Sequence, residues 1–264
     1  MFSKKSIYNN YELMPKTLTP DGIVTNYRCD ELTKIHSGKH ILFLGDSFAS
    51  GDGLDKEDTW CYKLYNKINK EESLSGYYNI GISSSSVSES IDQFFKYCYN
   101  YGNPDIVFFV ITEFDRDLKY STEDYLENFI FRLYFYLEQY CKSNNIQLYS
   151  FSWVKSINIE KPKKRYLFTN SFGKQEIRPL WTEQVESQYQ NNKHKNSYNL
   201  NLLESFDSFY DYSENSMIDE VFKNDTKSNS KEKSLWAMDL VHPGTSFHEF
   251  YCDFMYSKYK EKNK

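Results

Sequence analysis

The sequence predicts an α/β protein in which helices cover both faces of a parallel sheet. Two observations lead to this fold class. Short apolar runs, typical of buried strands, alternate with segments of helical periodicity from residue 40 to residue 153. The order is strand, helix, strand, helix, strand, helix, strand, which favours parallel pairing with crossover helices.

Four segments have the pattern of strands. The first, "HILFLG" (40–45), is a continuous apolar run closed by glycine, as expected of a strand buried on both faces. "GYYNIGI" (76–82) is a second short strand, and "IQLYSFSW" (146–153) is the last. "PDIVFFVIT" (104–112) has the strongest pattern, because six mostly β-branched or aromatic residues follow the proline and aspartate.

Helical periodicity fills the intervals and the end of the chain. The first predicted helix begins at about Glu57, with Trp60, Leu64 and Ile68 on one face. Three further helices are predicted over 86–102, 121–145 and 246–260. Ser246 and Glu249 have the spacing of a capping box at the start of the last helix.

The chain is predicted to form one main domain with two additions. Residues 1–38 are polar with scattered aromatics, and we expect an arm or irregular strands packing on the core. Residues 39–264 form the α/β domain. Within it, about 155–235 are rich in Asn, Ser, Lys, Tyr and Glu, with weak periodicity, which predicts a helical and loop insertion that shapes a substrate cleft.

Composition excludes several classes of function. The net charge of -5, from 32 basic and 37 acidic residues, leaves no electrostatic footprint for nucleic acid. The N-terminus lacks the apolar core of a signal peptide, and no stretch approaches the roughly 20 apolar residues that span a membrane. We therefore expect a cytoplasmic or virion-associated protein without a membrane partner.

The five cysteines argue against a disulfide framework and against a zinc site, since their number is odd and none are closely paired. We expect most of them to be buried thiols in a reducing compartment: Cys29, Cys61, Cys98, Cys141 and Cys252. His36, His40 and His248 have no ligand-like spacing, so surface or helix-end positions are predicted and no metal is inferred.

Ser47 is the first candidate for chemistry. It follows the first strand in "FLGDSF", and in open α/β sheets ligands bind at the carboxyl ends of the strands. Taken alone, the segment is as typical of a strand followed by a turn, with Asp46 as a helix cap, as it is of a strand that ends in a nucleophile.

The second candidate is the pair Asp239 and His242 in "WAMDLVHPGT", just before the last helix. An acid three residues from a histidine can bind one ring nitrogen and leave the other free to act as a base. Alone, the pair is a weak signal. It becomes informative beside Ser47, because a serine nucleophile needs a base.

Gly45-Asp46-Ser47 together with Asp239-x-x-His242 resembles the SGNH/GDSL hydrolase superfamily, and "GDSFASGDGL" is similar to its bacterial and phage members. The resemblance implies a flavodoxin-like, three-layer α/β/α fold. It also implies ester hydrolysis without a cofactor or metal, with Ser47 as nucleophile, His242 as base and Asp239 as its orienting acid.

The resemblance also locates the oxyanion hole, the set of donors that stabilises the negative oxygen of the transition state. The family's glycine after the second strand falls on Ser84, whose backbone N–H can still donate beside that of Ser47. Gly81 is expected to give this loop additional backbone freedom.

The third family block departs from the pattern, because Phe114 stands where the family has a donating asparagine. Losing such a donor typically lowers the rate by about 10²–10³. Thr112, Arg116 or a residue of the insertion could replace it, or the enzyme is slow. Glu113 could orient a substrate hydroxyl, although structural ion pairs are the commoner role of such residues.

The resulting prediction is a serine esterase acting on a small-molecule or polysaccharide ester, with O-acetyl groups on carbohydrate as the expected substrate. Two alternatives stay open. One is a non-catalytic binding or structural protein of the same fold, such as part of a viral particle. The other is an O-acyltransferase that uses the same triad.

Overall fold

The structure is a computed structural model that describes residues 38–112, 114–117, 123–152, 206–210 and 244–264, together with two short strand pairs elsewhere. Those pairs are β1 (Thr17–Leu18) with β2 (Val24–Thr25), and β7 (Arg165–Thr169) with β8 (Gln175–Pro179), both antiparallel.

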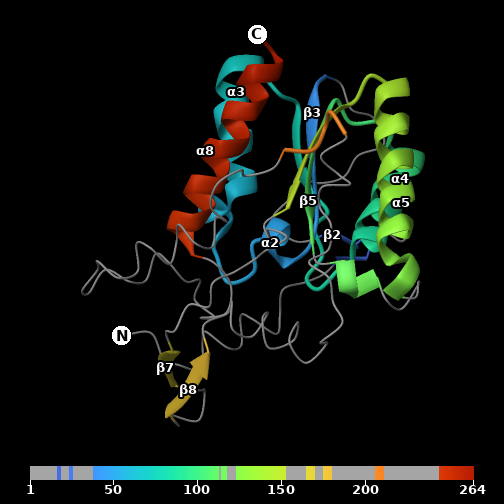
Figure 1. The fold of residues 1–264 in the computed structure, drawn as a ribbon. Helices are drawn as coiled ribbons and strands as arrows, with labels where there is room; N and C mark the ends of the chain where they lie inside the picture. Colours follow the sequence, from blue (N-terminus) through green and yellow to red (C-terminus); the bar gives the residue numbers. More distant parts are fainter. Residues whose placement is uncertain are drawn as a thin grey trace.

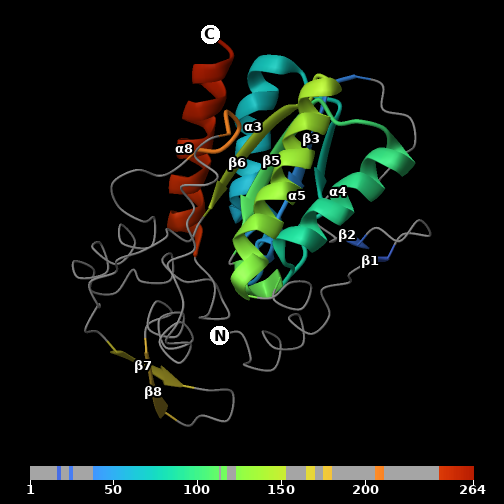
Figure 2. The same ribbon diagram turned by 45° about the vertical axis from the view of Figure 1, so that its right-hand side comes forward.

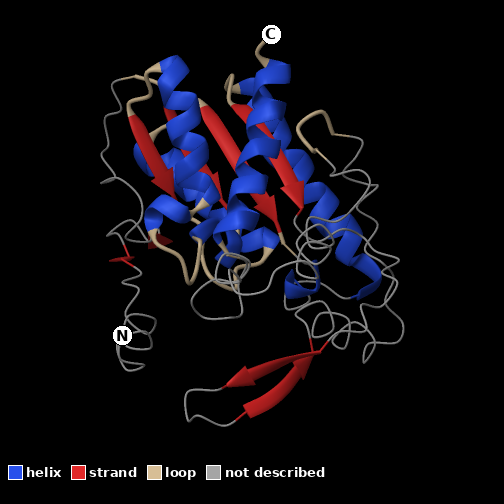
Figure 3. Cartoon of the chain, turned by 90° about the vertical axis from the view of Figure 1, so that its left-hand side faces the viewer, coloured by secondary structure: helices blue, strands red, loops and turns tan. Residues whose placement is uncertain are grey.

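The centre of the fold is a parallel sheet of four strands, with the order β4-β3-β5-β6. The strands are β3 (His40–Leu44), β4 (Gly76–Asn79), β5 (Ile106–Ile111) and β6 (Gln147–Ser152). Their arrows point the same way in Figure 3. In sequence order this is strand 2-1-3-4, the flavodoxin-like arrangement, so the predicted fold class is confirmed.

Two pairs of helices cover the two faces of this sheet. The helices are α3 (Trp60–Glu72), α4 (Val87–Tyr101), α5 (Glu123–Ser143) and α8 (Thr245–Lys262). Figure 1 shows α3 beside α8 on one side of the sheet and α4 and α5 on the other. Figure 2, turned by 45°, keeps the same three layers.

The continuous apolar run of β5 is explained by these two covered faces. Val107, Phe109 and Ile111 pack in the cluster under α4 and α5, whereas Phe108 and Val110 pack in the cluster under α3 and α8. All five side chains are fully buried. Full burial of an aliphatic or aromatic side chain stabilises a fold by about 1.5–3 kcal/mol, which makes this strand the centre of the core.

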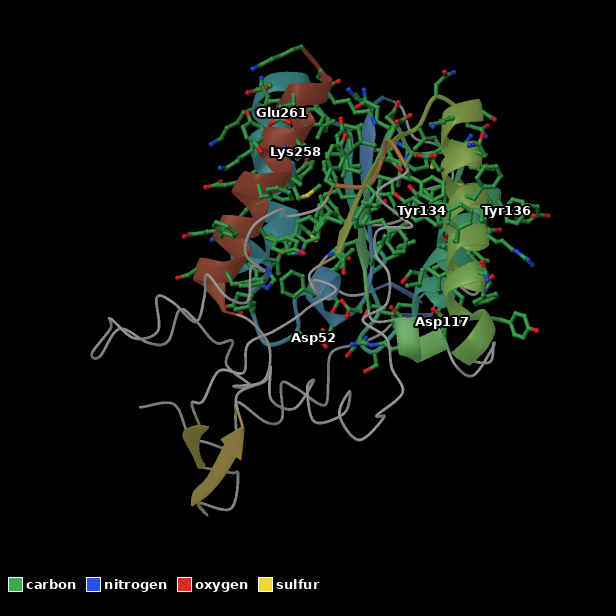
Figure 4. The ribbon with its side chains drawn as sticks, in the orientation of Figure 1. Asp52, Asp117, Tyr134, Tyr136, Lys258 and Glu261 are labelled. Atoms are coloured by element: carbon green, nitrogen blue, oxygen red, sulfur yellow. The ribbon has the colours of Figure 1, made fainter. Side chains whose placement is uncertain are left out.

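The helices themselves are amphipathic in the way the sequence predicts. On α5, Tyr134 points toward the sheet and is buried, whereas Tyr136 points away and is exposed (Figure 4). The predicted face of α3, formed by Trp60, Leu64 and Ile68, is also fully buried.

Two predicted helix starts need correction. α3 begins at Trp60 with Thr59 as its cap, because the residues from Lys56 to Asp58 form a separate 3-10 turn, η1. The capping box at Ser246 and Glu249 is wrong. α8 begins at Thr245 after Gly244, so Ser246 already lies inside the first turn, and Glu249 pairs with Lys63 at 3.0 Å.

A capping box does occur at the start of α4. The Ser86 side chain accepts from the Glu89 N–H, and the Glu89 carboxylate accepts from the Ser86 N–H at 2.9 Å. Ser86 is the residue immediately before the first helical one, which is the position this motif requires.

Surface or helix-end positions are predicted for His40 and His248. Both side chains are buried, so a surface position is wrong for each, whereas the helix-end position is confirmed for His248. His248 lies in the first turn of α8, and its Nδ1 accepts from the Trp60 N–H at 3.0 Å. It therefore caps α3 from another helix. His40 begins β3 with its ring near Tyr78 and Tyr97. His36 lies outside the described residues.

The parts of the expected helical and loop insertion that the structure describes are strand and turn, and not helix. Residues 165–179 contain the β7–β8 hairpin rather than a helix. Residues 206–210 extend the sheet, because the Ser208 carbonyl accepts from the Ser150 N–H at 2.7 Å and the Tyr210 N–H donates to the Ser150 carbonyl at 2.8 Å. The division of the chain at 38 and at 155–235 stays a prediction.

The buried carboxylate of Glu138 holds this added segment. Glu138 Oε1 accepts from the Ser208 N–H at 3.2 Å and from the Ser208 hydroxyl at 2.8 Å. A buried carboxylate needs such partners, since leaving it unpaired would be costly.

Four of the five cysteines are buried free thiols, as predicted, and Cys29 lies outside the described residues. Burial raises the pKa of Cys98 and of Cys252 to about 12. No helix within the described ranges has the length and apolar character needed to cross a bilayer.

We expect the free energy of unfolding to fall as the pH rises from about 8.5 toward 12. In the unfolded chain these thiols lose their protons near pH 8.5, whereas the folded protein keeps Cys98 and Cys252 protonated to about pH 12. Their contribution is therefore complete below pH 8.5 and is lost above it. Urea unfolding at pH 8 and pH 10 measures the difference, and it should shrink in Cys252→Ala. An equal difference in that variant would contradict the assignment.

Candidate active site

Ser47 lies at the topological switch point of the sheet. The chain leaves β3 toward β4 on one side and then crosses to β5 on the other side of β3. The loops after β3 and β5 therefore diverge, and in open α/β folds the crevice between such loops is the usual ligand site. Ser47 follows β3, and Thr112 follows β5.

Ser47 is the first residue of the short helix α2 (Ser47–Ser50) and is partly exposed, although the rest of that helix is buried. The Ser47 carbonyl accepts from the Gly51 N–H at 2.9 Å. Within the described ranges, neither the Ser47 N–H nor its hydroxyl forms a hydrogen bond. As far as the described residues extend, both groups are therefore free to bond a further partner.

A helix of four residues cannot hold itself together, so its surroundings fix α2. The Phe48 carbonyl accepts from Trp60 Nε1 at 3.0 Å. The Ala49 carbonyl accepts from Asn79 Nδ2 at 2.7 Å and from the Cys61 thiol at 3.3 Å. Side chains from α3 and β4 thereby hold the helix that begins at Ser47 in place.

Asp46 connects α2 to the loop after β5. It is fully buried, and its Oδ1 caps α2 by accepting from the Phe48 N–H at 3.0 Å. Its Oδ2 accepts from the Thr112 hydroxyl at 3.0 Å and pairs with Arg116 Nη1 at 3.2 Å. Asp46 therefore acts as more than the helix cap that the sequence suggested.

The start of α8 packs directly on α2. The ring centroid of Phe48 lies 5.1 Å from those of Phe247 and His248 and 4.9 Å from that of Tyr251. Burial, and then the negative charge of Asp46, raise the pKa of the Tyr251 hydroxyl well above its ordinary value. The Tyr251 side chain is therefore neutral at physiological pH.

Ser84 lies in a tight turn facing this region. The Ser85 N–H donates to the Ile82 carbonyl at 3.0 Å, which places Ser84 third in a four-residue turn with a φ of 64°. Glycine is preferred where φ is positive in such a turn, and glycine is the residue of the resembled family. Ser84 is exposed, and its N–H forms no hydrogen bond with the described residues.

We expect Ser84→Gly to stabilise the fold by up to about 1 kcal/mol, because glycine removes the left-handed strain and part of this gain is lost to unfolded-chain entropy. The backbone N–H, which is the group of Ser84 that is predicted to act, is retained. Urea unfolding measures the change. Ser83→Gly is the control, because Ser83 has no positive φ and glycine there should destabilise. A stabilised control would contradict the explanation.

Gly81 permits close contact between the loop after β4 and α2. A Cβ at this position would lie 2.9 Å from the Ala49 Cβ and from the Ser50 nitrogen. The Gly81 N–H donates to Asn79 Oδ1 at 3.0 Å. Asn79 was missed in the sequence, where its signal is a single amide side chain at the end of a buried strand.

Asp117 is another buried carboxylate, and sequence reasoning missed it. Its Oδ2 accepts from the Val87 N–H at 3.0 Å, and it also bonds the Ser88 hydroxyl, so it caps α4 from the η2 turn (Phe114–Asp117). Figure 4 shows Asp117 at the same end of the sheet as Asp52 of the loop after α2.

The structure thus gathers five of the predicted site residues at the carboxyl end of β3, β4 and β5: Ser47, Gly81, Ser84, Thr112 and Arg116. Asp239, His242 and Glu113 lie outside the described residues, and their roles stay predictions, as do the oxyanion roles of Ser47 and Ser84.

No family model and no curated protein matches this chain, whereas several solved structures do. The esterase EstA from Pseudoalteromonas sp. is 17% identical with a TM-score of 0.49, over 84% of this chain and 97% of that one. A GDSL-like lipase from Bacteroides thetaiotaomicron is 14% identical with a TM-score of 0.46, over 98% of both chains. The acetyl xylan esterase AlAXEase is 16% identical with a TM-score of 0.47, over 83% and 98%.

Proposed function

We propose that this chain is a serine esterase of the SGNH/GDSL type that cleaves a small ester through an acyl-Ser47 intermediate. The observation that carries the proposal is the position of Ser47. It is the partly exposed first residue of a fixed helix, at the switch point of the sheet. Its hydroxyl and N–H form no hydrogen bond within the described ranges.

His242 is the proposed base, and Asp239 is the acid that orients it. In the sequence His242 precedes Gly244 by two residues, and two residues span at most about 7 Å of chain. Gly244 caps α8, whose first turn packs on Phe48 beside the nucleophile. Covalent connection to α8 therefore supports a base from this segment.

In the proposed reaction the Ser47 oxygen attacks the ester carbonyl while His242 takes its proton. The N–H groups of Ser47 and Ser84 stabilise the oxyanion, and Asp239 stabilises the imidazolium without accepting the proton. His242 then gives the proton to the leaving alcohol. Water, activated by the same base, releases the acid and restores Ser47.

For the substrate we propose O-acetyl groups on carbohydrate. The residues between about 155 and 235 are polar and rich in tyrosine, and aromatic rings can stack on sugar faces. A panel of acetylated mono- and oligosaccharides, compared with a simple acetyl ester, tests this part of the proposal.

Labelling with a fluorophosphonate probe tests the mechanism. The serine oxygen displaces fluoride, and mass spectrometry of the digested protein should find the phosphonyl group on the peptide that contains Ser47. Ser75→Ala, at the opposite end of the sheet, is the matched control and should label fully. If folded protein takes no label and cleaves no acetyl ester, the non-catalytic alternative is correct. If an acyl-enzyme persists until a sugar acceptor is added, the protein is a transferase.

A further inference from the structure

Arg116 lies between the two loops that carry the proposed oxyanion donors. Its Nη1 pairs with Asp46 Oδ2 at 3.2 Å and donates to the Ser85 carbonyl at 3.2 Å. Asp46 immediately precedes Ser47, and Ser85 immediately follows Ser84. One guanidinium nitrogen therefore joins the neighbours of both donors.

Two further hydrogen bonds tie the same loops together. The Gly45 carbonyl accepts from the Ile82 N–H at 2.9 Å and from the Ser85 hydroxyl at 3.0 Å. The loop of residues 45–47 is thereby connected to the turn of residues 82–85 by bonds on both sides of Ser84. Among these connections, Arg116 alone adds a charge.

We propose that Arg116 is a positioning residue that fixes the spacing of the Ser47 and Ser84 N–H groups and offsets the charge of Asp46 beside the oxyanion. The inference rests on the proposed function, because the two N–H groups matter only if an oxyanion forms there. Arg116 acts through Asp46 and Ser85 and is not assigned a contact with the substrate.

The charge of Asp46 makes this role necessary. A carboxylate next to the nucleophile is unfavourable for an oxyanion, and the repulsion is strong at a buried site with little water to screen it. The Asp46 carboxylate is almost fully buried. The paired guanidinium cancels most of this repulsion and also satisfies the buried Oδ2.

The sequence of η2 explains why an arginine occupies this place. Phe114, which stands at the family's asparagine position, and Arg116 are both in this four-residue turn. A planar guanidinium can donate to two acceptors at once in a fixed geometry, whereas a lysine ammonium is a flexible point charge. The turn that lacks the amide donor thus supplies a bridge between the remaining donors.

The experiment compares kcat and KM of Arg116→Gln and Arg116→Lys with those of the wild type. Each kcat is divided by the fraction of sites that the fluorophosphonate probe titrates, so misfolded protein does not count. We expect kcat to fall by about tenfold to a hundredfold in Arg116→Gln, as for small misplacements of catalytic groups, and less in Arg116→Lys. KM should change little. Arg132→Gln, on the exposed face of α5, is the control.

Adding Asp46→Asn to Arg116→Gln should restore part of the lost kcat, because the amide keeps the cap on α2 and removes the unpaired charge. If the normalised kcat of Arg116→Gln equals that of the wild type, or if Asp46→Asn gives a further loss instead of a recovery, the inference is wrong. A wild type that takes no label contradicts the proposed function and this inference together, whereas a labelled wild type with fully active Arg116→Gln contradicts this inference alone.

Discussion

Replacing Ser47 with alanine should lower kcat for ester hydrolysis by about 10⁶-fold, the size of loss known when a triad serine is removed. The melting temperature should stay within about 2 °C of the wild-type value, since substitutions at the surface usually change the free energy of unfolding by no more than about 0.5 kcal/mol. The reason is structural, because the Ser47 hydroxyl forms no hydrogen bond with the described residues and its removal leaves no unpaired group. Steady-state kinetics and calorimetry measure both quantities.

The same argument extends to the proposed base. His242→Ala should cost about as much as Ser47→Ala, and the double variant should be no slower than either single variant, because members of a triad act as a unit. His248→Leu is the histidine control. It removes the ring nitrogen that accepts from the Trp60 N–H and should lower stability, with kcat per titrated site unchanged. Losses that multiply in the double variant would show that His242 does not serve Ser47.

Much of the fold could be predicted because burial on two faces leaves a strong local pattern. The run from Ile106 to Ile111 is apolar at every position, since alternate residues enter different layers of the core. Helix starts were less predictable. Ser246 and Glu249 have the right spacing for a capping box, but the spacing does not reveal that α8 begins at Thr245.

The site was predictable only where its signal is local. Ser47 follows a strand that is evident in the sequence, whereas the partners of Asp46 come from a loop about 70 positions later. Nothing near Arg116 in the sequence shows that it bridges Asp46 and Ser85, because the contact depends on how the loops after β3, β4 and β5 converge. Asn79 was missed for the same reason.

Gly45→Ala should cause the largest loss of stability at the site, about 2–6 kcal/mol from backbone strain and overpacking together. Gly45 has a φ of 139°, which side-chain-bearing residues rarely adopt. A Cβ there would lie 2.8 Å from the Val110 Cβ and 2.9 Å from the Val110 carbonyl oxygen, in the centre of the sheet. Because Val110 is fully buried in β5, it cannot move aside, and the loop that carries Ser47 must shift instead.

Gly102→Ala is the control that separates the cost of backbone strain from the cost of a steric clash of the added Cβ. Gly102 also has a positive φ, of 91°, but nothing lies within 4 Å of the position its Cβ would take. The control should lose only about 1–2 kcal/mol and keep its activity, because only backbone strain remains. In Gly45→Ala the melting temperature should fall by about 5 °C or more. The activity of its folded fraction should fall as well, since the Gly45 carbonyl anchors Ile82 and Ser85. Equal losses of stability in the two variants would mean that the close approach to Val110 does not hold the loop of Ser47 in place.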